Sequence, residues 1–309
     1  MNLPKLRHAK VYELFRNGLL IPEETIKSIL KLPRATLAED LHKIIKHGLD
    51  NFDAYFEKTE PDDEDWNKHD GYFMLHAVML LGEMRHEESL PLLLEVQRQE
   101  SDFTDFWFSL DFTESTWQSL LLCGQNQLDV LLDFMREPND SARDTAGYTN
   151  VAIAVVRLIL LNPHRKPEVI AWFDALLAYY IENEDDAQIL DLETATFVIL
   201  ELQYIKSTKL LPHIKYFYDN QLIEPDIMED DYDSYVKEMQ NASLAEKLPR
   251  FFPNVLEWYK LMREEAIRNL AREQEIKNSP WYPAYLNYLR RRKNKKGEVE
   301  SSDIPGAAR

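Results

Sequence analysis

Apolar side chains recur three and four positions apart over most of the chain, the spacing that places them on one face of an α-helix. Through the middle of the sequence an apolar helix, a short turn and a second apolar helix follow one another repeatedly. The second helices are predicted to begin near Leu90, Leu128, Val169 and Leu211, at intervals of 38, 41 and 42 residues. The pattern therefore predicts consecutive helix pairs that repeat at this interval.

A repeat of this length is typical of stacked helix pairs of the HEAT and armadillo type. The predicted fold class is all-α, an α-solenoid of HEAT/armadillo-like antiparallel helix pairs. We expect an N-terminal helical lead-in over residues 1–50 and the repeats over residues 51–240. Residues 241–289 are predicted to form C-terminal helices packing on the last repeat, and residues 290–309 a basic, disordered tail.

Composition supports helix and excludes several classes of protein. Of 309 residues, 45% are hydrophobic and only 8 are glycine, which favours a helical chain with a sizeable core. The single cysteine, Cys123, excludes an internal disulfide framework and a zinc cluster built on cysteines. The start of the chain lacks the apolar core of a signal peptide, and no run approaches the roughly 18 apolar residues that cross a bilayer. We therefore expect a cytoplasmic protein with no membrane contact.

The formal charge of −18 bears on the choice of partner. A negative field repels phosphate backbones, so nucleic acid is not an expected ligand, except through the basic segment Arg290–Lys296. That segment can either bind an anionic ligand or fold onto the acidic surface of the same chain. The second alternative needs no partner and is favoured.

No catalytic or metal-binding motif stands out from the repeats. His86 to Leu90 contains only half of an H-E-x-x-H zinc motif, because position 90 is leucine. His69 and His76 share a helix face if the helix already covers Asp70, but no third ligand is fixed locally, so a capping His69 and a hydrogen-bonded His76 are favoured. Cys123 is interpreted as a packed small hydrophobe. We therefore predict no cofactor, no metal and no enzymatic activity.

Charge varies in phase with the repeat. The loops between repeats are acidic, whereas most turns inside repeats are neutral or basic, as in His164–Lys166 and Lys206–Lys209. Caps and helix dipoles explain single acids at the starts of helices, but not four or five acids in one loop. Equivalent loops of a solenoid line up, so we expect an acidic edge opposite a neutral-to-basic edge. The acidic loops lie at Glu60–Asp65, Glu100–Asp105, Glu137–Asp144, Glu182–Asp186 and Asp226–Asp233.

A second candidate surface is the aromatic stretch FTDFWFSLDF over residues 103–112. Large aromatic side chains beside acids suit a groove for a peptide or protein. The alternative is a short helix that covers the hydrophobic layer between repeats, and this alternative is favoured. The candidate protein-binding residues of the two surfaces are Phe106, Trp107, Asp111, Trp117, Asp185, Asp186, Glu229, Asp230 and Asp231.

Two stretches of the chain resemble a known family. These are YFMLHAVMLLGEMRHEESLPLLL over Tyr72–Leu94 and LLPHIKYFYDNQLIEPDIM over residues 210–228. Both are similar to the bacterial family known as domain of unknown function 1186, over roughly residues 35–240. The resemblance implies an all-helical, HEAT-like fold and no established activity. Some members carry a cysteine-rich zinc knuckle in a C-terminal tail, and this chain departs from that pattern because its tail has no cysteine.

The sequence therefore predicts a non-enzymatic, cytoplasmic helical-repeat scaffold or adaptor that binds another protein through an acidic edge, which a basic partner would complement. One alternative is an enzyme that acts on nucleic acid from a concave helical-repeat face. Another is attachment to nucleic acid through Arg290–Lys296. The negative charge argues against the first alternative, because it requires a basic groove.

Overall fold

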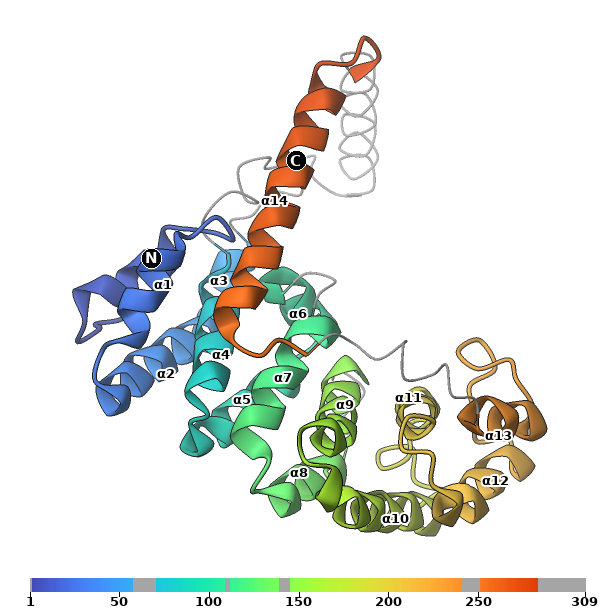
Figure 1. Cartoon of the computed structure of the whole chain (residues 1–309). Helices are drawn as coiled ribbons and strands as arrows, with labels where there is room; N and C mark the ends of the chain where they lie inside the picture. Colours follow the sequence, from blue (N-terminus) through green and yellow to red (C-terminus); the bar gives the residue numbers. More distant parts are fainter. Residues whose placement is uncertain (1, 58–70, 109–111, 139–144, 241–250, 283–309) are drawn as a thin grey trace, which may run out of the picture. The chain divides into compact units, whose positions relative to one another are not determined.

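The computed structural model describes residues 2–57, 71–108, 112–138, 145–240 and 251–282. Every regular element in these ranges is a helix, so the predicted all-α class is confirmed (Figure 1). None of these helices has both the length and the apolar character needed to cross a membrane. The α-helices are α1 (Glu23–Leu30), α2 (Arg34–Asp50), α3 (Phe52–Phe56), α4 (Phe73–Met84), α5 (Leu90–Gln97), α6 (Ser101–Phe108), α7 (Phe112–Gly124), α8 (Leu128–Met135), α9 (Thr145–Leu161), α10 (Lys166–Glu182), α11 (Leu192–Leu202), α12 (Leu211–Asp219), α13 (Tyr232–Gln240) and α14 (Val255–Lys277). The described residues also form the 3₁₀ segments η1 (Ala9–Phe15), η3 (Glu87–Ser89), η5 (Pro163–Arg165) and η6 (Thr208–Leu210).

The chain divides into two compact units, Met1–Trp258 and Tyr259–Arg309. Helices α1 to α13 lie in the first unit, and its elements pack in chain order. Helix α2 packs on α4, α4 on α7, α7 on α9, and α9 on α11, while α8 packs on α10 and α10 on α12. Three second helices of the predicted pairs begin at the expected residues, Leu90, Leu128 and Leu211, and the fourth begins slightly earlier, at Lys166.

Three of the second helices share a local start. A 3₁₀ turn precedes each one, and a proline stands near its beginning, at Pro91 in α5, Pro167 in α10 and Pro212 in α12. Proline suits this position because the first helical N–H groups have no partner inside the helix and its φ is already helical. The same turn chemistry therefore sets the direction of the second helix in three of the pairs.

Side-chain hydrogen bonds connect residues one repeat apart. Gln127 donates to the carbonyl of Glu87 at 3.0 Å, and Arg165 donates to the carbonyl of Gln125 at 2.5 Å. Both links span 40 residues of sequence. The indole Nε1 of Trp172 donates to the carbonyl of Leu128 at 2.7 Å, 44 residues away. These bonds satisfy carbonyls in the turns of one helix pair with side chains from the next pair.

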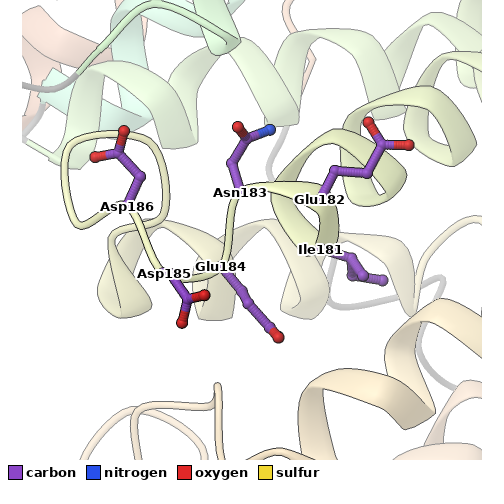
Figure 2. A pocket seen from close by; sticks show the side chains of 6 residues that line it. All are labelled: Ile181, Glu182, Asn183, Glu184, Asp185 and Asp186. Carbon is purple, nitrogen blue, oxygen red and sulfur yellow. The ribbon is translucent and has the colours of Figure 1, made fainter.

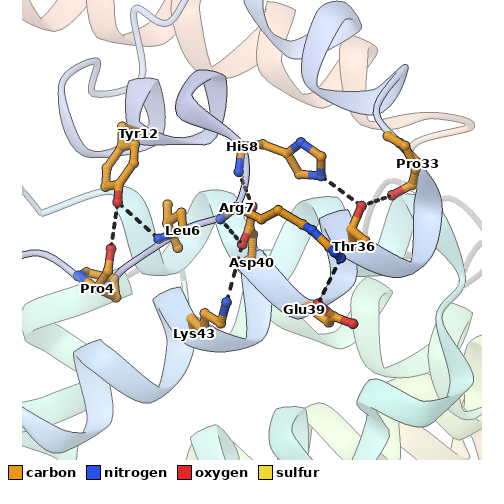
Figure 3. A network of polar contacts seen from close by, with 10 residues as sticks. All are labelled: Pro4, Leu6, Arg7, His8, Tyr12, Pro33, Thr36, Glu39, Asp40 and Lys43. Carbon is orange, nitrogen blue, oxygen red and sulfur yellow. Dashed lines mark hydrogen bonds and ion pairs between the residues drawn. The ribbon is translucent and has the colours of Figure 1, made fainter.

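The N-terminal segment is anchored on α2 by a buried carboxylate. Asp40 is fully buried and accepts from the backbone N–H groups of Arg7 and His8 at 2.7 and 2.8 Å (Figure 3). His8 also contacts the hydroxyl of Thr36 at 2.8 Å. Two charge-assisted hydrogen bonds compensate the burial of one carboxylate, so residues before η1 are tied to the core without being helical themselves.

The start of the C-terminal region does not follow the prediction for residues 241–289. Gln118 of α7 exchanges two hydrogen bonds with the backbone of Phe252, at 2.9 and 3.0 Å. Glu83 of α4 accepts from the backbone N–H of Val255 at 2.8 Å. Residues 252–255 therefore contact the early pairs, where the sequence analysis placed this segment on the last repeat. Residues 241–250 and the predicted tail 290–309 lie outside the described ranges.

Candidate protein-interaction surface

Two acidic loops meet at helix α12. The loop after α10 contains Asp185 and Asp186, and the loop after α12 contains Glu229, Asp230 and Asp231, all of them exposed. On one side, the hydroxyl of Tyr216 in α12 donates to both carboxylate oxygens of Glu184, at 3.0 and 2.9 Å. On the other side, Tyr218 is close enough to Asp230 and Asp231 for their charges to raise the pKa of its phenol, in addition to the larger effect of burial. Helix α12 thus interacts with both of the predicted acidic loops.

The loop after α10 forms an open hollow of about 470 Å³ lined by Ile181–Asp186. Figure 2 shows the carboxylates of Glu182 and Asp186 on one side of the loop and those of Glu184 and Asp185 on the other. Acids close together repel each other unless a cation or a hydrogen-bond donor compensates them. Four of the six residues that line the hollow are acidic, and one of them, Glu184, accepts from Tyr216.

Some acids of these loops have a structural role. Asp191 caps α11 by accepting from the N–H of Thr194 at 2.8 Å. Asp231 accepts from the N–H of Ser234 at 2.8 Å, and the hydrogen bonds from Ser234 lower the pKa of its carboxyl. Asp186 accepts from the N–H of Gln188 at 2.9 Å. These contacts orient the loops, as caps do elsewhere.

Three other acids of these loops have no such contact with the described residues. Asp185, Glu229 and Asp230 are exposed and form no ion pair with the described residues. Elsewhere in the first unit acids are often paired: Arg98 donates to both oxygens of Glu137, at 2.8 and 2.6 Å. The loops at α12 therefore keep several negative charges available to solvent.

The remaining predicted acidic loops are only partly covered by the structure. Glu60–Asp65, Asp140 and Asp144 lie outside the described ranges. Glu137 is bound by Arg98, which comes from the preceding inter-repeat segment. On the predicted basic turns, Arg165 pairs with Glu168 at 2.7 Å, so part of that positive charge is neutralised locally.

The aromatic stretch is a helix where it is described, as the favoured alternative predicted. Helix α6 covers Ser101–Phe108, and Trp107 exposes only 2% of its surface. Trp117 in α7 exposes 1%. The two tryptophans therefore belong to the core, which corrects their assignment as binding residues: both lie on helix faces that pack inward. Phe106 is half-buried, and Asp111 lies outside the described residues.

Sequence reasoning missed several residues near these surfaces. Tyr216 and Tyr218 connect the acidic loops, and Phe52 and Phe56 of α3 contact Phe106. The sequence did contain a signal for the two tyrosines, because they lie on the predicted helix between two acidic loops and alternate there with an apolar residue. Phe52 and Phe56 stand four apart on one helical face.

Cys123 and His76 are both buried. Burial raises the pKa of the Cys123 thiol to about 12, which keeps it protonated at neutral pH. His76 is fully buried, and its Nε2–H donates to the carbonyl of Asn17 at 3.0 Å. His69 lies outside the described residues. In the part of the chain that the structure covers, no group of three or more His, Cys, Asp and Glu side chains is arranged to hold a metal ion.

Comparison with known proteins gives no family assignment. No family model, no curated protein and no solved structure matches this chain. The resemblance to the family known as domain of unknown function 1186 therefore stays a prediction.

Proposed function

We propose that the first unit is an α-solenoid of HEAT/armadillo-like helix pairs and that the chain is a non-enzymatic, cytoplasmic scaffold for a basic protein. Support for the repeat comes from the contacts between successive helices and from side-chain hydrogen bonds that recur at 40 residues. Stacked repeats contact mainly their neighbours and present long surfaces, which suits a binding function.

The observation that carries the binding proposal is the group of exposed acids at α12. Asp185, Glu229 and Asp230 come from two loops and have no ion-pair partner among the described residues. A lysine- or arginine-rich partner would bring complementary positive charge to these exposed carboxylates. Complementary charges of this kind raise the association rate and make binding depend on salt.

A defined probe tests the proposal on the full chain. We expect a fluorescently labelled lysine-rich peptide to bind at low salt and to dissociate as salt rises. A variant with Asp185→Asn, Asp186→Asn and Asp230→Asn should bind the peptide about tenfold more weakly, since three rim charges contribute about 0.5 kcal/mol each. Asparagine keeps a side-chain oxygen at Asp186, so the loop retains its hydrogen bond to Gln188.

The matched control changes the same number of charges elsewhere. Glu264, Glu265 and Glu275 are exposed on α14, and the variant with glutamine at all three positions has the same net charge as the test variant. We expect this control to weaken the peptide by less than about twofold. If both variants weaken binding equally, only the total charge of the chain matters, and a specific acidic surface is ruled out.

A further inference from the structure

Helices α3 and α6 bring three partly exposed phenyl rings together. The ring centroids are 5.2 Å apart for Phe52 and Phe56, 5.6 Å for Phe52 and Phe106, and 5.8 Å for Phe56 and Phe106. Phe56 exposes 46% of its surface, and the other two rings are half-buried. We call these three residues the aromatic platform.

The core holds the platform in place from below. Phe52 contacts the buried ring of Phe103 at 5.2 Å, and Phe106 contacts the buried ring of Trp107 at 4.7 Å. Both contacts are edge-on, the arrangement that aromatic pairs favour. A rigid aromatic surface loses little conformational entropy when it binds a ligand, so exposed rings of this kind are effective contact residues.

Four exposed acids lie close in sequence to the rings of the platform. Asp53 and Glu57 flank Phe56, and Asp102 and Asp105 flank Phe106; all four side chains are exposed. Neither α3 nor α6 contains a lysine or arginine, and these acids form no ion pair with the described part of the chain. The platform therefore combines the negative faces of aromatic rings with carboxylates that have no ion pair among the described residues.

We propose that the aromatic platform binds an arginine side chain of a basic protein segment. A guanidinium over a phenyl face gains a cation–π interaction, its alkyl stem covers apolar surface, and the flanking carboxylates complement its charge. Arginine fits better than lysine because its planar group can stack on a ring. The inference rests on the proposed function in one respect: it assigns the basic partner a second contact, separate from the loops at α12.

The test uses the full chain and two labelled peptides. One peptide contains arginines spaced by leucines, and the other replaces each arginine by citrulline, which has the same shape without the charge. Phe56→Ala should weaken the arginine peptide about tenfold and the citrulline peptide by less than about twofold. Equal losses for both peptides would overturn the assignment, because the ring would then contribute only apolar contact.

Two further variants test whether the loss of affinity comes from the aromatic ring of Phe56. Phe56→Leu keeps the apolar volume and removes the ring, so it should lose nearly as much arginine-peptide affinity as Phe56→Ala. Full affinity in Phe56→Leu would also contradict a cation–π contact. Leu160→Ala removes an apolar side chain that is 48% exposed on α9, and it should leave the affinity unchanged.

The same titrations separate this inference from the proposed function. Suppose that Asp185→Asn, Asp186→Asn and Asp230→Asn together weaken binding of the arginine peptide and Phe56→Ala does not. The arginine site on the platform is then wrong, and binding by the acidic loops is supported. If only Phe56→Ala weakens binding of the arginine peptide, the arginine site on the platform is supported and binding by the acidic loops is wrong. Two other occupants of the platform would also overturn the proposal. A second copy of the chain would be seen as dimerisation that Phe56→Ala abolishes. The chain's own segment Arg290–Lys296 would be seen as tighter peptide binding after truncation at Asn287.

Discussion

Polar side chains are buried and hydrogen-bonded in the interior between α7 and α9, whereas they are exposed in the loops at α12. In the interior, the amide of Asn150 donates to Gln97 at 3.0 Å and to Thr116 at 2.8 Å, and all three side chains are buried. At the loops, Asp185 and Asp230 are exposed and have no cationic partner among the described residues. Buried polar groups must be paired to avoid a desolvation cost, whereas exposed charges can remain available. The difference indicates that stability depends on the interior and that the loops are free to bind.

The largest effect expected from this comparison is at the buried ion pair of α9 and α11. The Nη1 of Arg157 is 3.2 Å from Glu201, and the guanidinium lies over the ring of Tyr204 at 4.8 Å. Only 1% of Arg157 is exposed, and burial raises the pKa of Glu201. Arg157→Ala leaves a buried carboxyl unpaired, so we expect it to lower the free energy of unfolding by about 3–5 kcal/mol in urea titrations.

A double variant distinguishes loss of pairing from loss of volume. Arg157→Met with Glu201→Leu replaces both charges by apolar side chains of similar size. Such replacements are often neutral or stabilising, so this variant should recover most of the free energy lost in Arg157→Ala. A double variant as unstable as Arg157→Ala would mean that the pair itself stabilises the fold.

The next effect tests how closely α9 approaches helix α5. A Cβ atom added to Gly147 would lie 2.0 Å from the carbonyl oxygen of Gln97, which is backbone and cannot rotate away. We expect Gly147→Ala to lower the free energy of unfolding by about 3 kcal/mol, at the upper end of overpacking costs. Gly124→Ala is the control, because its Cβ would meet only the ends of two leucine side chains, at 3.2 Å or more. Equal stability in the two variants would contradict the close approach.

A third effect arises from His76, whose pKa burial lowers to about 4. An unfolded histidine titrates near 6.5, so between these values the unfolded chain binds more protons than the folded chain. The stabilising effect is therefore complete above about pH 6.5 and is lost as the pH falls towards 4. Between about pH 7.5 and about pH 5 the loss from His76 should be about 2 kcal/mol.

The measurement is the difference between the native chain and His76→Gln. Both chains contain the same other titrating groups, so the difference in their pH dependence isolates His76. Urea titrations at the two pH values should show a smaller loss in His76→Gln, by about 2 kcal/mol. Parallel curves would show that His76 does not stay neutral in the folded state.

Sequence predicted the helices better than their packing, for a physical reason. Apolar spacing is a local property, and it located the starts of α5, α8 and α12 correctly. The contact between Gln118 and Phe252 joins residues 134 positions apart, and no local pattern encodes it. Aromatic residues occur both in cores and at interfaces, so the sequence leaves Trp107 and Trp117 as candidates for either, and only the packing of α6 and α7 distinguishes the two.

The acids of the candidate site could be predicted from the sequence, but their arrangement in space could not. Charge is visible in the sequence, so the acids at Asp185 and Asp230 could be named from it. Their convergence on α12 could not, because it depends on a tyrosine hydroxyl reaching Glu184 from 32 residues away. The platform of Phe52, Phe56 and Phe106 likewise exists only because α3 and α6 are neighbours.

The smallest expected effect is the change in the free energy of unfolding when the loop acids are replaced. It tests directly whether the interior stabilises the fold while the loops are free to bind. Asp185→Asn, Asp186→Asn and Asp230→Asn together should change the free energy of unfolding by less than about 0.5 kcal/mol, since exposed residues without ion pairs contribute little to the fold. Urea titrations of this variant, beside the peptide titrations, measure both properties on one protein. A large loss of stability would mean that these acids hold the fold together, and the division between a stabilising interior and a binding surface would then be wrong.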